Sequence, residues 1–214
     1  MPGITALRGL YAIVDPEHCG GRDPLWVAER VLAGGCALLQ LRDKRGEPAA
    51  TRALATALHE RCRSAGVPFV LNDFPALAAE LGADGLHLGQ DDAPIAEVRI
   101  TVGSMAIGLS THSPEQAARA ADQGADLIGF GPVFDTRTKH NPDATVGLST
   151  LRRVVAASPI PVVAIGGITE ANAPQVAATG TALAAVISAL CQAPDPAQAA
   201  QALHTHWTGV ATTA

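Results

Sequence analysis

A short stretch near residue 130 combines a buried strand with groups that bind anions. Residues 126–130 form a largely apolar run that begins at Asp126, and Gly131-Pro132 cannot continue a strand in the middle of a sheet. The loop that follows carries two hydroxyls and one cation, on Thr136, Thr138 and Lys139. A buried strand that leads into such a loop predicts an anion site at the carboxyl end of a sheet. On this stretch alone, an exposed loop with an ordinary lysine explains the pattern equally well.

Two carboxylates follow neighbouring strands and indicate a metal site. Asp73 comes after the apolar residues 69–71, and Asp92 comes after residues 85–88. Mg²⁺ is usually held by one or two carboxylates, with substrate phosphates and water completing its coordination. We therefore expect Asp73 and Asp92 to bind one Mg²⁺ per active site. The alternative for either residue is a helix N-cap, which Asp92 before Pro94 would suit.

Cationic side chains are expected at the same end of the sheet. Arg42 and Lys44 follow the strand expected at residues 37–41, and Lys139 lies after the strand expected at 126–130. An arginine binds a phosphate through a planar fork and a lysine binds it as a point charge. Carboxylates that hold a metal and face these cations suit a diphosphate, although each cation taken singly could be an ordinary surface charge.

A second anion site is indicated by two later loops. Gly166-Gly167 follows one apolar run, and Ile187-Ser188 follows the next. Barrel proteins often bind a phosphate at these places, through loop and helix amides. Two anion sites in one mouth imply two phosphorylated ligands, or one ligand with two phosphates. His87 alternates with leucines and is expected to point inward, as a buried structural histidine rather than a general base.

Eight strand-then-helix units account for the chain. Strands are expected at residues 10–14, 37–41, 69–71, 85–88, 106–109, 126–130, 161–165 and 182–187. Helices are expected at residues 25–32, 48–65, 75–81, 94–99, 114–123, 148–157, 169–180 and 196–204, with Ser113 and Thr169 as N-caps.

Short connections and parallel strands fit a single (β/α)8 barrel domain over residues 1–214, with a frayed tail at 208–214. A doubly wound open sheet is the alternative, because periodicity does not show closure. In a barrel the active site lies at the carboxyl ends of the strands, where the polar residues named above are found.

Composition excludes several classes of protein. Hydrophobic residues make up 48% of the 214 residues and aromatic residues only 3%, so Ala, Val, Leu and Ile must form the core. A net charge of −5 argues against a nucleic-acid surface. The 4 cysteines are scattered and are expected to be reduced packing residues in a cytoplasmic protein. No signal peptide, membrane-spanning stretch, P-loop or Ser-His-Asp arrangement is expected.

Six motifs, in order along nearly the whole chain, resemble those of the thiamine-phosphate synthase family. They are Gln40-Leu-Arg-Asp-Lys44, Asn72-Asp73, Gly85-Leu-His-Leu-Gly-Gln-Asp-Asp92, Ile107-Gly-Leu-Ser110, Gly129-Phe-Gly-Pro-Val-Phe-Asp-Thr-Arg-Thr-Lys139 and Ala164-Ile-Gly-Gly-Ile168. The resemblance implies a (β/α)8 barrel that joins hydroxymethylpyrimidine diphosphate to a thiazole phosphate. The products would be thiamine phosphate and pyrophosphate.

The resemblance also implies roles for individual residues. The pyrimidine diphosphate would be bound by Gln40, Leu41, Arg42, Asp43, Lys44, Asn72, Ser110 and Lys139. The thiazole phosphate would be bound by Thr136, Arg137, Thr138, Gly167, Ile187 and Ser188. Arg42, Lys44, Ser110 and Lys139 would be the catalytic residues, and Asp73 and Asp92 would ligate Mg²⁺.

The motifs depart from the family at His140-Asn141 and at Ser149, which affects loop geometry rather than the chemistry.

Two other functions fit parts of the sequence. A thiazole tautomerase of the same superfamily would not require the carboxylates and cations expected for metal and diphosphate. A non-catalytic thiamine-phosphate sensor would need a signalling surface. The motifs leave open the oligomeric state, including a homo-oligomer, and whether the thiazole carries a carboxylate.

Overall fold

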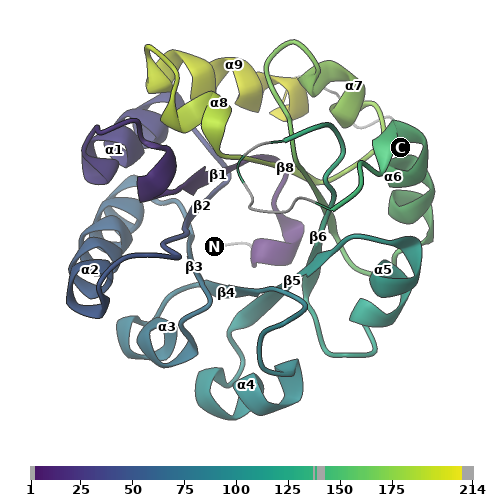
Figure 1. The fold of residues 1–214 in the computed structure, drawn as a ribbon, viewed down its shortest axis with the longest axis horizontal. Helices are drawn as coiled ribbons and strands as arrows, with labels where there is room; N and C mark the ends of the chain where they lie inside the picture. The colour runs from purple at the N-terminus through teal and green to yellow at the C-terminus, as the bar shows by residue number, and fades with distance from the viewer. Residues whose placement is uncertain (1–2, 137, 139–142, 209–214) are drawn as a thin grey trace.

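Eight parallel strands close into a barrel in the computed structural model, which describes residues 3–136, 138 and 143–208 (Figure 1). The strands are β1 (Gly9–Val14), β2 (Leu38–Leu41), β3 (Phe69–Asn72), β4 (Gly85–Leu88), β5 (Ala106–Thr111), β6 (Leu127–Phe130), β7 (Val162–Ile165) and β8 (Leu183–Val186). Each strand pairs with the next along the chain, and β8 pairs with β1. Closure confirms the predicted (β/α)8 barrel and excludes the open sheet.

Helices form the outer ring of the barrel (Figure 1). They are α1 (Pro24–Gly34), α2 (Pro48–Ala65), α3 (Pro75–Leu81), α4 (Ile95–Val102), α5 (Pro114–Ala120), α6 (Gly147–Ala157), α7 (Ala173–Ala177), α8 (Ser188–Cys191) and α9 (Pro196–Thr208), with short 3-10 helices η1 (Ile4–Ala6) and η2 (Pro16–His18). The carboxyl-terminal residues 209–214 of the expected tail lie outside the described part, whereas Thr208 ends α9.

The structure differs from the sequence predictions at two helices, α7 and α8. Thr169 is not the N-cap of α7, which begins at Ala173 with Asn172 before it. The Asn172 side chain accepts from the Thr169 N–H at 2.8 Å and donates to the Gly167 carbonyl at 2.9 Å, which keeps residues 169–172 as a turn. The four-residue helix α8 has no counterpart among the predicted helices, because so short a segment shows no helical periodicity.

Small and branched aliphatic side chains build the core in two layers. The larger layer lies between the strands and the helices and includes Leu39, Phe69 and Ile107. The smaller layer fills the barrel itself and includes Ile4 of η1, Tyr11 and Ile13. Because the interior is packed, the barrel offers a rigid base on which the polar strand ends are held. The four cysteines are buried and free, as expected for packing residues.

None of the helices in the described part of the chain is long and apolar enough to cross a bilayer.

Two isoleucines offer a matched test of the core. Ile107 on β5 is 0% exposed, whereas Ile100 on α4 is 87% exposed. Ile107→Ala should lower the free energy of unfolding by about 2–5 kcal/mol, since it leaves a cavity in a packed layer. Ile100→Ala should change it by less than about 0.5 kcal/mol. Urea unfolding of both variants measures this difference, and equal effects would contradict the described packing.

Candidate active site

All eight strands contribute to one cavity of about 460 Å³ at their carboxyl ends. Most of the residues proposed from the sequence line it: Gln40, Arg42, Lys44, Asn72, Asp73, Asp92, Ser110, Thr136, Thr138, Gly167, Ile187 and Ser188. The packed interior of the barrel forms its floor, through Tyr11, Ile13 and Val163. The predicted location of the site, at the carboxyl ends of the strands, is therefore where these side chains converge.

Two of the proposed residues that the structure describes do not line the cavity, and two more lie outside the described part of the chain. Leu41 is fully buried in the outer core layer, because alternate residues of a strand point to opposite faces. Asp43 accepts from the Gly46 N–H at 2.8 Å and from the Thr51 hydroxyl at 2.7 Å, so its carboxylate holds its own loop. Arg137 and Lys139 lie outside the described residues.

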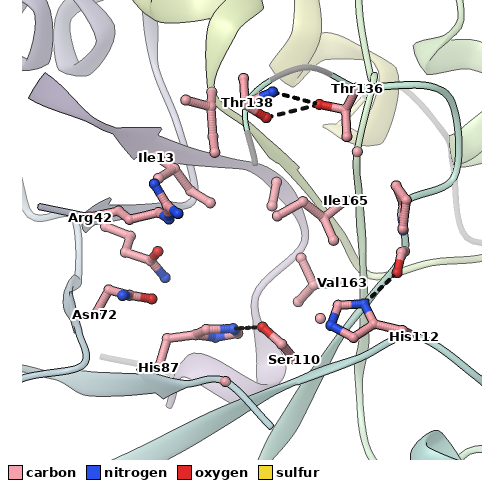
Figure 2. Close-up of a pocket in the computed structure, with 18 of the residues that line it drawn as sticks. Ile13, Arg42, Asn72, His87, Ser110, His112, Thr136, Thr138, Val163 and Ile165 are labelled. Atoms are coloured by element: carbon pink, nitrogen blue, oxygen red, sulfur yellow. Dashed lines mark hydrogen bonds between the residues drawn. The ribbon is translucent and has the colours of Figure 1, made fainter. Parts of the chain in front are cut away.

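Gln40 and Arg42 lie on the side of the cavity formed by β1 and β2. Gln40 is bonded to a side chain of β1, and Arg42 is bonded to the residue that follows β1. Gln40 Nε2 donates to the Tyr11 hydroxyl at 2.6 Å. Arg42 Nη1 donates to a carboxylate oxygen of Asp15, which is completely buried. Figure 2 shows Arg42, Asn72 and His87 along one wall of the cavity, with Thr136 and Thr138 at a separate part of it. The Asn72 Nδ2 is buried and has no hydrogen-bond partner among the described residues.

Asp73 and Asp92 lie close enough to interact, with Lys44 beside them. Burial raises the pKa of Asp73, and the Asp92 carboxylate adds to this effect, while the Lys44 ammonium, which pairs with Asp73, opposes it. Asp73 Oδ1 is buried and unpartnered in the described part of the chain. Asp92 Oδ2 accepts from the Gly89 N–H at 2.6 Å. Neither aspartate is a helix N-cap, since Phe74 and Pro94 hold those positions.

This acidic pair fits one hard cation. The described residues contain no group of three or more His, Cys, Asp or Glu side chains arranged around a metal. Mg²⁺ does not need such a cage, because one or two carboxylates with phosphate and water oxygens complete its coordination. Two adjacent carboxylates, one with an unpartnered oxygen, match that requirement.

His87 is a buried histidine that is hydrogen-bonded to Ser110. His87 Nε2 lies 2.9 Å from Ser110 Oγ, as drawn in Figure 2. Burial lowers the pKa of His87 to about 4, so the ring is neutral at pH 7. Nδ1 has no partner among the described residues, and an unpaired buried N–H is costly, so the proton belongs on Nε2. Ser110 Oγ then accepts from His87, and its own proton is free for a ligand.

Glycines make room for this histidine and for the loop after β7. A Cβ at Gly108 would lie 2.6 Å from His87 Nδ1. Gly167, with φ of 66°, approaches the loop after β6 so closely that a Cβ would lie 2.5 Å from the Asp135 carbonyl oxygen. Near it, the hydroxyls of Thr136 and Thr138 lie 2.9 Å apart. The absence of a side chain at Gly167 therefore lets the two loops touch, and Gly167 and Ser188 both line the cavity.

Further residues of the site belong to none of the predicted motif roles. Tyr11, His112 and Asp143 line the cavity, and Asp15 lies directly behind Arg42. His112 Nδ1 lies 2.7 Å from the Gly131 carbonyl oxygen and 3.4 Å from an Asp143 carboxylate oxygen. The alternation of Tyr11 and Ile13 along β1 is the sequence signal that could have placed Tyr11 on the inner face of the barrel.

Comparison with known proteins agrees with this geometry. A family model described as thiamine monophosphate synthase matches residues 10–190. The thiamine-phosphate synthase of Laribacter hongkongensis is 44% identical over 197 residues, which cover 91% of this chain and 93% of the relative. That of Bacillus licheniformis is 42% identical over 201 residues, covering 92% and 89%.

A solved structure supports the same assignment. The thiamine phosphate pyrophosphorylase from Pyrococcus furiosus superimposes with a TM-score of 0.85 at 33% identity, and the match covers 92% of this chain and 94% of that one. Sequence relatives and fold thus agree over nearly the whole chain, and they confirm the resemblance drawn from the motifs. The chain belongs to the thiamine monophosphate synthase family.

Proposed function

We propose that this enzyme condenses hydroxymethylpyrimidine diphosphate with a thiazole phosphate, giving thiamine phosphate and pyrophosphate. The observation that carries the proposal is one cavity with two groups of anion-binding residues. Arg42 and Lys44 lie beside the acidic pair, while Thr136, Gly167 and Ser188 come from the loops after β6, β7 and β8. Membership of the family supports the identity of both substrates.

The pyrimidine end is the wall that carries Gln40, Asn72 and Ser110. The unpartnered Nδ2 of Asn72 is a buried donor that needs an acceptor, and the ring nitrogens of a pyrimidine are acceptors. Ser110 has a hydroxyl proton to donate, because His87 already donates to its oxygen. Leu41 and Asp43 serve this wall from outside the cavity, through the packing of β2 and the shape of its loop.

We place one Mg²⁺ at Asp73 and Asp92. When bound, the ion would supply positive charge beside the diphosphate oxygens. The Lys44 ammonium pairs with Asp73 at the cavity wall, and its three N–H donors allow it to reach a phosphate oxygen as well. The Arg42 guanidinium uses one nitrogen for Asp15, which leaves its other N–H groups for the diphosphate.

The chemistry then needs positioned charges and no protein nucleophile. The C–O bond between the pyrimidine methylene and the diphosphate breaks, and the electron-rich aminopyrimidine stabilises the cation left on that carbon. The thiazole nitrogen forms the new C–N bond. Arg42, Lys44 and Lys139 stabilise the departing charge, and a preorganised contact of this kind contributes roughly 3–4 kcal/mol. The role of Lys139 rests on its place in the motif.

The thiazole phosphate is assigned to Thr136, Arg137, Thr138, Gly167, Ile187 and Ser188. Thr136, Thr138, Gly167, Ile187 and Ser188 line the cavity, and Arg137 is included by its place in the motif.

A cytoplasmic location is part of the proposal, because buried cysteines without disulfides are usual in reducing compartments.

Turnover with both substrates tests the function and the metal together. The enzyme should release one pyrophosphate for each thiamine phosphate formed, EDTA should abolish the reaction, and Mg²⁺ should restore it. Asp73→Asn should lower kcat by a factor of about 100 or more, as expected when a preorganised charge is lost. It should also lose the rise in thermal midpoint that Mg²⁺ with inorganic pyrophosphate gives the wild type.

Asp122→Asn is the control for that variant, because Asp122 is exposed and is not among the residues lining the cavity. Full turnover in EDTA would contradict the metal assignment. Failure of the wild type to form thiamine phosphate would contradict the proposed function.

Ser188→Ala tests which end of the cavity binds the thiazole phosphate. Loss of a hydroxyl contact to a phosphate should raise the KM for the thiazole phosphate about tenfold. The KM for the pyrimidine diphosphate should stay near the wild-type value. Ser64→Ala on the exposed face of α2 is the control. If only the pyrimidine diphosphate binds more weakly, the two ends are assigned in reverse.

His87 gives a prediction on stability and pH. Its folded-state pKa of about 4 lies below the ordinary 6.5, so unfolding takes up a proton between these values. Stability should therefore fall as the pH is lowered from about 6.5 to about 4. His87→Gln removes this titration and should flatten that part of the curve of unfolding free energy against pH. Parallel curves for the variant and the wild type would show that His87 is not buried and neutral.

A further inference from the structure

A buried carboxylate lies behind the cation that faces the diphosphate. Asp15 follows β1, is 0% exposed and is not among the residues that line the cavity. Its Oδ2 accepts from Arg42 Nη1, and its Oδ1 accepts from the Glu17 N–H at 3.0 Å. His18 Nδ1 lies 3.3 Å from the same Oδ1. A carboxylate so deeply buried needs a cationic partner, and Arg42 provides it.

The pairing of β1 with β2 fixes this contact. Val14 is in register with Leu41, and the Arg42 N–H donates to the Val14 carbonyl at 3.0 Å, so Asp15 and Arg42 follow at the next position of the ladder. The same strand pair brings Tyr11 to Gln40 at 2.6 Å. Side chains are thus bonded across this strand pair at two levels, Gln40 to Tyr11 within the strands and Arg42 to Asp15 just beyond them.

Orientation matters because an arginine side chain is flexible. The Asp15 contact is made by one guanidinium nitrogen, and the planar fork has further N–H groups that lie at the cavity wall. A guanidinium that is already fixed loses less conformational entropy when an anion binds. It is also aimed at the departing charge before the reaction begins.

We infer that Asp15 is a positioning residue, which holds the Arg42 guanidinium toward the diphosphate without touching the substrate. This inference rests on the proposed function, since it concerns the substrate arm that binds the pyrimidine diphosphate. A positioning residue differs from a purely structural one in two respects. Its substitution acts through Arg42, and it weakens the use of one substrate only.

Asp15→Asn is the direct test, because the amide keeps the size of the side chain and can still accept from the Glu17 N–H. The variant should lose about 10-fold to 100-fold in kcat/KM for the pyrimidine diphosphate, as expected for a displaced charge. The KM for the thiazole phosphate should stay within about twofold of the wild type. In an Arg42→Ala background, Asp15→Asn should cause no further loss, because the two residues act as one unit.

Asp126→Asn is the matched control. Asp126 also bonds an arginine, with Arg99 Nη2 at 3.0 Å, and a backbone N–H, that of Ile107 at 2.8 Å, but it precedes β6 at the opposite end of the barrel. It should lower the thermal midpoint and leave both KM values unchanged. An equal loss for both substrates in Asp15→Asn, or the same loss in the Arg42→Ala background, would overturn the inference.

A second variant covers the case in which Asp15→Asn does not fold. Asp15→Glu keeps the charge and the ion pair but moves the carboxylate by one methylene. It should fold, and a loss of several-fold should again be confined to the pyrimidine diphosphate. No loss, or a loss shared by both substrates, would overturn the inference. If the wild type turns over and Asp15→Asn has the same kcat/KM, only the positioning role is rejected. If the wild type is inactive, the proposed function is rejected.

Discussion

Charges of both signs share one cavity in this barrel, and the way they balance decides what the cavity can bind. The Asp15 carboxylate is completely buried and is matched by Arg42. Asp73 is matched less well, since burial and Asp92 raise its pKa in spite of the Lys44 ammonium. One of its oxygens has no partner in the described part of the chain. Lys44 supplies one positive charge beside two carboxylates, and the proposed metal ion would supply more.

The barrel makes this arrangement possible by bringing distant residues to one rim. Because β1 pairs with β8 and closes the barrel, Asp73 and Asp92, Arg42 and Ser188 all line a single cavity. Glycines then determine how closely the parts approach. Gly108 leaves space for the His87 ring, and Gly167 lets the loop after β7 touch the loop after β6. A methyl group at either position would displace groups that we assign to opposite ends of the substrate pair.

Much of this fold could be predicted from local sequence, because strand and helix signals are local. Residues 75–81 and 85–88 were predicted with the bounds that α3 and β4 have. The positions of Gln40 and Asn72 in the cavity follow from strand alternation. A linear motif, however, does not separate Arg42, which faces the cavity, from Leu41 and Asp43, which do not. Strand alternation accounts for Leu41, whereas the position of Asp43 depends on its bonds to Gly46 and Thr51, which only the structure shows.

Pairing also distinguishes aspartates that look alike in the sequence. Asp15, Asp73 and Asp92 each follow a strand, so each could be a metal ligand, a cap or an ion-pair partner. Asp15 is bonded to a guanidinium and a backbone N–H, which satisfies its charge and makes it an anchor. Asp73 keeps a buried oxygen without a partner beside Asp92, as judged from the described residues, and the proposed cation site rests on this observation. The roles that we propose for these aspartates thus follow from their partners. Asp15 is already neutralised by Arg42, whereas Asp73 still has an oxygen that a ligand can use.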